Sequence, residues 1–130
     1  MPRFGKTSTA RLRTCHPSLQ KLFNEVVKHF DCSIIGGHRN EAEQDKVFYD
    51  GKSTVQFPNS KHNSIPSMAV DVVPYPIDWK DRNRMRYFAG FVKGIATGMG
   101  YKIRWGGDWD SDTEVKDNHF QDLPHFEIKT

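Results

Sequence analysis

The feature that most constrains the fold of this chain is a set of possible metal ligands that lie far apart in the sequence. His62 and Asp71 belong to neighbouring segments, whereas His125 lies close to the C-terminal end. Two imidazoles and one carboxylate form a ligand set suited to Zn²⁺, and three protein ligands leave the fourth position open for water. A site made of residues so distant has to be assembled by the fold, so we expect the three segments to meet in space.

Two helices are predicted in the first half of the chain. The first begins near residue 17 and carries apolar residues at helical spacing. Asn40 and Glu43 are placed to form a capping box for the second, which is expected to end before Gly51. The apolar stripe of the first helix consists of Leu19, Leu22, Phe23, Val26, Val27 and Phe30.

A third and longest helix is predicted in the second half of the chain. Asp78 is expected to cap its beginning, and the helix should run towards Gly98 or Gly100. The residues expected to face inward from it are Met85, Phe88, Val92, Ile95 and Met99.

Four strands are expected, separated by polar loops at 52–67 and 106–120. Asp71 and His125 both fall within predicted strands, so they could project from one face of a sheet, with His62 contributed by the loop before Asp71. Helices and strands alternate without a regular βαβ rhythm, which indicates an α+β fold with a small, mainly antiparallel sheet and about three helices. The predicted strands cover residues 32–35, 68–73, 101–105 and 125–128.

Composition limits the classes of protein to which the chain can belong. Its 130 residues are enough for one domain, taken as 1–130, with a core that needs no disulfide. Cys15 and Cys32 are the only cysteines and are expected to be buried free thiols. The net charge of +3 suits an anionic polymer. However, lysines and arginines are interleaved with acidic residues, which argues against nucleic-acid binding, and no apolar run is long enough to cross a membrane.

The motifs around the possible ligands resemble those of the M15 zinc peptidases. This family includes D-alanyl-D-alanine carboxypeptidases and the phage L-alanyl-D-glutamate endolysins, and its metal core is similar to that of the Hedgehog domain. The similarity extends from about residue 4 to residue 128. It is carried by Ser60-x-His62, Ala69-x-Asp71, Asp122-x-x-His125-x-Glu127, the segment Gly37-His38-Arg39-Asn40, and the run Arg104-Trp105-Gly106-Gly107-Asp108-Trp109.

The resemblance implies roles for five residues. His62, Asp71 and His125 would bind a catalytic Zn²⁺, and Asp122 would act as general base and then acid. Arg39 would steady a substrate carboxylate or the developing oxyanion. The step from His62 to Asp71 is longer than is usual in the family. An aspartate also stands where the carboxypeptidase branch has a glutamate, which favours the endolysin branch.

For several other residues near the motifs, the sequence allows two interpretations. Glu127 could hydrogen-bond a ligand imidazole or be an ordinary charge at the end of a strand. Gln44 and Ser60 could contact substrate or support the loop, and His119 could replace His125 as a ligand. Trp105 is expected in the core, although both it and Trp109 could line a cleft. The acidic residues Asp108, Asp110, Asp112 and Glu114 lack the spacing of a calcium-binding loop.

These features together predict a monomeric zinc peptidase that cleaves the L-alanyl-D-glutamate bond of the peptidoglycan stem peptide. A D-alanyl-D-alanine carboxypeptidase and a non-catalytic, zinc-stabilised wall-binding domain are the alternatives. The start of the chain lacks the apolar core of a signal peptide. We therefore expect synthesis in the host cytoplasm and action on the wall after a separate, holin-type protein has permeabilised the membrane.

Overall fold

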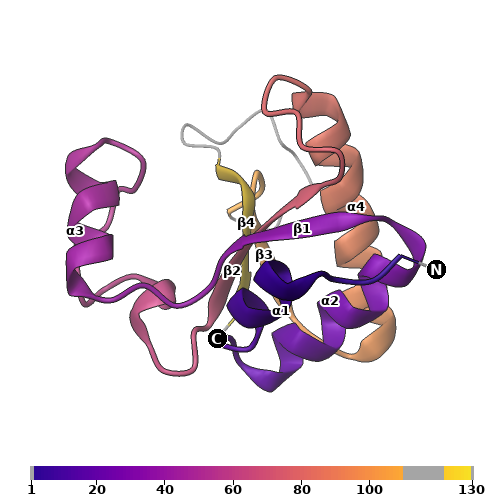
Figure 1. Cartoon of the computed structure of the whole chain (residues 1–130), viewed down its shortest axis with the longest axis horizontal. Coiled ribbons are helices and arrows are strands. Elements are labelled where there is room, and N and C mark those ends of the chain that lie inside the picture. The colour runs from indigo at the N-terminus through magenta and orange to yellow at the C-terminus, as the bar shows by residue number, and fades with distance from the viewer. Residues whose placement is uncertain (1, 110–121, 130) are drawn as a thin grey trace.

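A computed structural model describes residues 2–109 and 122–129 and shows four helices around a four-stranded sheet (Figure 1). The strands are antiparallel and lie in the order β1-β2-β4-β3. The predicted α+β class is thereby confirmed. The helices are α1 (Lys6–Leu12), α2 (Pro17–His29), α3 (Glu41–Tyr49) and α4 (Arg82–Met99), with a 3-10 turn η1 (Lys61–Asn63), and the strands are β1 (Cys32–Gly36), β2 (Ala69–Pro74), β3 (Ile103–Gly106) and β4 (Asp122–Ile128).

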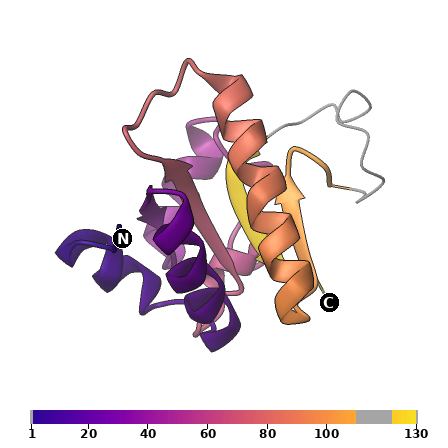
Figure 2. The ribbon, with the colours of Figure 1, turned by 90° about the vertical axis from the view of Figure 1, so that its right-hand side faces the viewer.

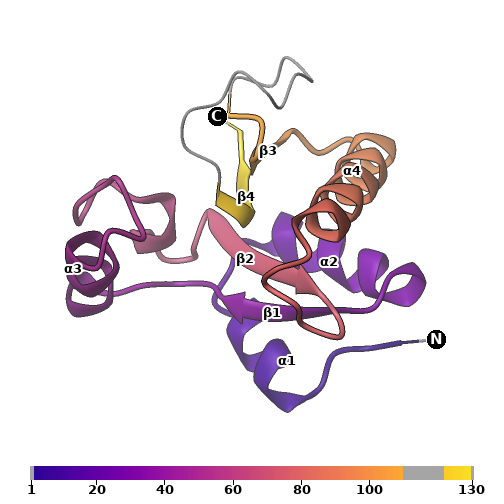
Figure 3. The ribbon, with the colours of Figure 1, turned by 90° about the horizontal axis from the view of Figure 1, so that it is seen from above.

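Helices α2 and α4 cover one face of the sheet, and α3 stands on the other side (Figures 2 and 3). The apolar stripe predicted for α2 packs into the core, where Phe23 meets Phe126 of β4 edge to face at 5.5 Å. Phe88 of α4 contacts the same ring at 6.1 Å. Two helices therefore pack against one face of the inner strand β4, and its other face can carry polar side chains.

The capping residues predicted for α3 form the expected capping box. The Asn40 side chain accepts from the Glu43 amide at 2.9 Å, and the Glu43 carboxylate accepts from the Asn40 amide at 2.9 Å. The prediction that Asp78 caps α4 is wrong. Asp81, rather than Asp78, accepts from the amide of Arg84 at 3.1 Å, while the Asp78 carboxylate is used in a turn with the amide of Lys80.

Helix α4 ends as predicted at Gly100, which has a φ of 82°. Its buried face is centred on Phe88, Val92 and Ala96, and Ile95 packs at the side of this face. The prediction that Met99 faces inward is wrong, because its place in the last turn lies at the edge of that face and leaves it 38% exposed.

Helix α1 was not predicted from the sequence. It is only seven residues long, it buries only Leu12, and no side chain caps its N-terminus. Its role is to cover the edge strand β1. The Ser8 hydroxyl accepts from the amide of Ile34, and Arg11 donates to the carbonyl of Ile34, both at 3.0 Å. These bonds occupy backbone groups that an edge strand would otherwise expose.

Strand β4 begins three residues earlier than predicted, at Asp122, although Pro124 lies within it. Proline cannot donate to a neighbouring strand, so it is tolerated where pairing is interrupted. The pairing of β3 with β4 shifts register between Trp105 and Gly106, opposite this part of β4.

The two cysteines are both free and buried, as predicted. Burial raises the pKa of Cys15 to about 11 and that of Cys32 to about 12. None of the described helices combines the length and the apolar character that a membrane span requires.

Candidate metal centre and cleft

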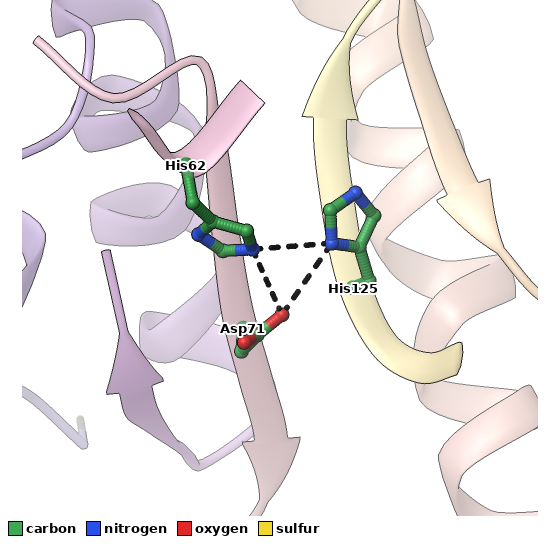
Figure 4. Close-up of side chains that lie close together, drawn as sticks. All are labelled: His62, Asp71 and His125. Atoms are coloured by element: carbon green, nitrogen blue, oxygen red, sulfur yellow. Dashed lines mark hydrogen bonds and ion pairs between the residues drawn. The ribbon is translucent and has the colours of Figure 1, made fainter. Parts of the chain in front are cut away.

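The structure brings His62, Asp71 and His125 together in one buried cluster. Asp71 of β2 is paired directly with His125 of β4, and His62 reaches the same point from η1. The distance from His62 Nε2 to His125 Nδ1 is 3.2 Å, and each of these nitrogens lies 3.5 Å from Asp71 Oδ1 (Figure 4). Four ligand atoms around Zn²⁺ at ~2.0–2.1 Å would be about 3.3–3.4 Å apart, so the triangle has the size that a zinc ion requires.

Local structure explains how a loop residue reaches this position. The side chain of Ser60 caps η1 by accepting from the amide of His62, and Asn63 closes the capping box. The turn is tied to the chain after β1, because the amide of Arg39 donates to the carbonyl of His62 at 2.8 Å. The loop predicted around His62 therefore contains one rigid turn that fixes the imidazole.

Hydrogen bonds outside the triangle decide which nitrogens face inward. His62 Nδ1 lies 2.7 Å from the carbonyl of Gly37, which can only accept, so this nitrogen carries the hydrogen. His125 Nε2 lies 2.7 Å from a carboxylate oxygen of Glu127 and donates to it in the same way. In the neutral rings, both inner nitrogens are then lone-pair acceptors. Asp71 Oδ1, a third acceptor, is buried and receives no hydrogen bond from the described residues.

Three acceptors that face one another require a positive charge between them. Burial raises the pKa of Asp71, but the adjacent His62 and His125 outweigh burial and hold it well below its usual value. Burial lowers the pKa of His125, whereas the Asp71 and Glu127 carboxylates raise it to about 9. Without an ion the cluster would hold a proton, and a divalent cation satisfies all three acceptors at once. The donor set therefore fits Zn²⁺.

Glu127 supports the cluster from the side opposite the triangle. One of its oxygens accepts from His125, and the other lies 3.1 Å from Lys61 Nζ and 2.9 Å from Arg104 Nη2. Burial raises its pKa, but these partners lower it to about 2, so the carboxylate stays ionised. Of the two interpretations of Glu127, the hydrogen bond to the imidazole of His125 is the one that the structure has.

Arg39 also contacts a predicted ligand, which the sequence did not indicate. Its Nη2 donates to Asp71 Oδ2 at 3.0 Å, and its Nη1 donates to Gln44 Oε1 at 3.3 Å. The guanidinium thus holds the outer oxygen of Asp71 and leaves the inner oxygen for the triangle.

Asp122 begins β4 beside the cluster, with Oδ2 3.9 Å from His125 Nδ1. Burial raises its pKa, and the neighbouring Asp71 carboxylate raises it further. A carboxyl group in this position is suited to accept and return a proton. Its placement depends on Gly106, because a Cβ at Gly106 would lie 2.0 Å from the carbonyl oxygen of Asp122. The sequence indicated this positioning residue only as part of a family motif.

Four of the five predicted site residues, Arg39, His62, Asp122 and His125, line a cleft of about 400 Å³, and Asp71 lines an adjoining hollow. Its lining includes the loop 52–55 together with Arg104 and Trp109, whose indole lies 5.2 Å from the His125 ring. Two adjoining hollows continue away from the cleft, and all three spaces meet at Lys52 and Asp122. A substrate could therefore extend past Asp122 in more than one direction.

The structure also places the other residues for which the sequence allows more than one possible role. Gln44 is fully buried and binds the loop 52–55 through Ser53 and the carbonyl of Val55, so it supports this loop. Trp105 lies in the core as expected, with its indole NH on the carbonyl of Leu123 at 2.7 Å. Asp108 is buried, whereas the alternative ligand His119 and the rest of the acidic loop lie outside the described residues.

Comparisons with known proteins show which family the chain resembles. A family model described as phage L-alanyl-D-glutamate peptidase matches residues 1–129. The L-alanyl-D-glutamate peptidase of Escherichia phage T5 is 30% identical over 120 residues, which cover 88% of this chain and 87% of that protein. The crystal structure of the Serratia marcescens L-Ala D-Glu endopeptidase ChiX is similar with a TM-score of 0.76 and 27% identity, covering 98% of this chain and 90% of that one.

Proposed function

This chain belongs to the phage L-alanyl-D-glutamate peptidase family, and on that premise we propose that it is a Zn²⁺-dependent endolysin that hydrolyses the L-alanyl-D-glutamate bond of peptidoglycan stem peptides. The chain is thus a peptidase, and its expected resemblance to the phage branch of the M15 zinc peptidases is confirmed. The proposed parts are the ion, the roles of single residues and the bond in this chain's own substrate.

One observation carries the proposal for the ion. His62 Nε2, His125 Nδ1 and Asp71 Oδ1 converge at 3.2–3.5 Å, while the outer nitrogen of each ring is already committed to another partner. In this arrangement three protein atoms would bind one side of an ion, and the other side of the ion would face the cleft. It is the ligand number typical of a catalytic rather than a structural zinc site.

When bound, Zn²⁺ lowers the pKa of a water molecule in its open position towards ~7, which makes hydroxide available at neutral pH. Asp122 would accept the proton of that water and later donate a proton to the leaving amine of the D-glutamyl residue. Its raised pKa supports the first step, because a carboxylate with a higher pKa is a stronger base, and the proton that it then holds is the one it would return. Its position at the meeting point of the cleft and the hollows supports contact with a bound peptide.

Arg39 would act in two ways. Its bond to Asp71 keeps the carboxylate oriented towards the ion, and its position in the cleft wall places positive charge near the peptide. We assign its positive charge to the developing oxyanion rather than to a two-bonded grip on a substrate carboxylate, since both terminal nitrogens, Nη1 and Nη2, already bind Gln44 and Asp71.

Digestion of purified peptidoglycan tests the proposal directly. Mass spectrometry should find new alanine C-termini and new glutamate N-termini with the native protein, and neither product with an Asp122→Asn control. Release of free D-alanine without these ends would instead identify a carboxypeptidase. A folded, zinc-loaded protein that releases no product would identify a wall-binding domain.

A further inference from the structure

Among the described residues, one of the cationic side chains in the cleft has no carboxylate partner. Four lysine and arginine side chains line it. Arg39 is paired with Asp71 at 3.0 Å, while Lys61 and Arg104 are both paired with Glu127, at 3.1 and 2.9 Å. The fourth is Lys52, which is exposed and has no carboxylate within ion-pair distance in the part of the chain that the structure describes.

The backbone of Lys52 is held firmly in place. The chain leaves α3 through Gly51, whose φ of 76° is readily available only to glycine. The amides of Lys52 and Ser53 then both donate to the carbonyl of Val47, at 2.9 and 3.1 Å. Buried Gln44 fixes the following residues through the Ser53 hydroxyl and the carbonyl of Val55. Because the backbone is fixed, the exposed ammonium can reach only the region around the cleft and its hollows, which lowers the entropy cost of binding a ligand there.

The position of Lys52 relates it to the reacting bond. Lys52 and Asp122 are the residues shared by the cleft and both adjoining hollows. A peptide whose scissile bond lies at Asp122 would therefore bring the residues next to that bond close to Lys52. The two side chains do not form an ion pair with each other, so Lys52 remains available while Asp122 serves the chemistry.

The proposed substrate supplies a matching anion. A glutamyl residue has two carboxyl groups, and only one of them can continue the peptide chain. The other remains beside the scissile bond as a carboxylate, unless it is amidated. From these observations we propose that Lys52 binds this glutamyl carboxylate and makes the enzyme selective for the free acid over the amide. The inference rests on the proposed function, because it takes the L-alanyl-D-glutamate bond as the bond cleaved.

The test compares two peptides that differ at one group. Both contain the L-alanyl-D-glutamate bond, and in the second the remaining glutamyl carboxylate is replaced by a carboxamide. The zinc-loaded native protein should cleave the acid with a kcat/KM roughly 10- to 100-fold higher than that for the amide, the factor expected from a hydrogen bond to a charged group. The difference should lie mainly in KM, because the contact exists before the reaction.

Three variants make the test specific. Lys52→Gln should cleave acid and amide at similar rates, whereas Lys52→Arg should restore much of the preference for the acid. Lys21→Gln removes the same charge from an exposed position on α2 and should keep the native ratio. Thermal melting and zinc content should be unchanged in all three, since neither lysine contributes to the core or to the ligand triangle.

The outcomes separate this inference from the proposed function. If Lys52→Gln kept the native ratio of acid to amide, even at lower overall activity, Lys52 would act through Asp122 or the fold, and the proposal would be overturned. Equal cleavage of both peptides by the native protein would overturn it too. Cleavage of neither peptide would refute the proposed function, and the assignment of Lys52 would fall with it.

Discussion

Asp71 and His125 lie directly opposite each other on β2 and β4, with Asp71 Oδ1 3.5 Å from His125 Nδ1. Two of the three proposed ligand atoms are thus positioned by sheet pairing rather than by a loop. A shift of one residue in this register would turn one side chain to the other face of the sheet. The apolar residues of β4, which pack against α2 and α4, prevent such a shift.

His125→Ala should abolish stoichiometric zinc binding, because it removes one of three ligands and leaves the other two without the geometry of the site. Elemental analysis of protein purified without added metal measures this. His29→Ala, at an exposed position on α2, is the matched control and should keep one zinc per chain. Full zinc content in His125→Ala would show that another residue is the ligand, with His119 the first to test.

Asp122→Asn should retain zinc and the fold but lose activity by roughly 10²–10⁴-fold, the contribution expected of a general base. The amide has nearly the same size as the carboxyl group but cannot accept the proton. Steady-state kinetics on an L-Ala-D-Glu peptide, together with zinc content, measure both effects. Near-native turnover would remove Asp122 from the mechanism, and loss of zinc would make it a ligand.

Glu127→Gln should weaken zinc binding by about 10- to 100-fold, because the ligand His125 would lose the anionic partner that orients its ring. Competition with a chelator of known affinity measures the change. Glu25→Gln replaces an exposed carboxylate that also contacts a histidine, His29, and should leave zinc affinity unchanged. An unchanged affinity in Glu127→Gln would mean that this contact does not tune the site.

Gly106→Ala should lower activity and stability together, because the added Cβ would meet the backbone of Asp122 at 2.0 Å and force β3 and β4 apart. Gly94→Ala on α4 is the control. Its Cβ would have no neighbour within 4 Å, so alanine should stabilise the helix by up to ~1 kcal/mol. Melting curves and peptide cleavage measure both variants. Full activity in Gly106→Ala would show that the strands can separate without moving Asp122.

The thiols of Cys15 and Cys32 should resist alkylation at pH 8 in the native protein. Burial raises their pKa values to about 11 and 12, so both remain protonated, and the thiolate is the reactive form. Both should react in denaturant, where the pKa returns to its ordinary value near 9. Mass spectrometry after timed alkylation counts the modified thiols. Rapid modification of the native protein would contradict the burial of these residues.

The sequence alone was sufficient for features that depend on local pattern or on residue chemistry. The apolar stripe of α2, the capping box at Asn40 and Glu43 and the turn at Gly100 follow from neighbours within a few positions. The proximity of His62, Asp71 and His125 was also predicted correctly, because few residue types bind metals and the surrounding motifs resemble a family. Helix α1 was not predicted, because it is stabilised by contacts with β1 rather than by a helical pattern of apolar residues in its own sequence.

Only the tertiary structure decided how these residues are used. It showed that Gly37 and Glu127 orient the imidazoles of His62 and His125, that Arg39 binds Asp71, and that the absence of a side chain at Gly106 leaves room for Asp122. It also showed that, in the part of the chain that is described, the other cations of the cleft are paired with carboxylates, and the role proposed for Lys52 rests on this. Each of these facts is a contact between segments distant in sequence. Such contacts depend on strand register and packing, and no local pattern of residues records them.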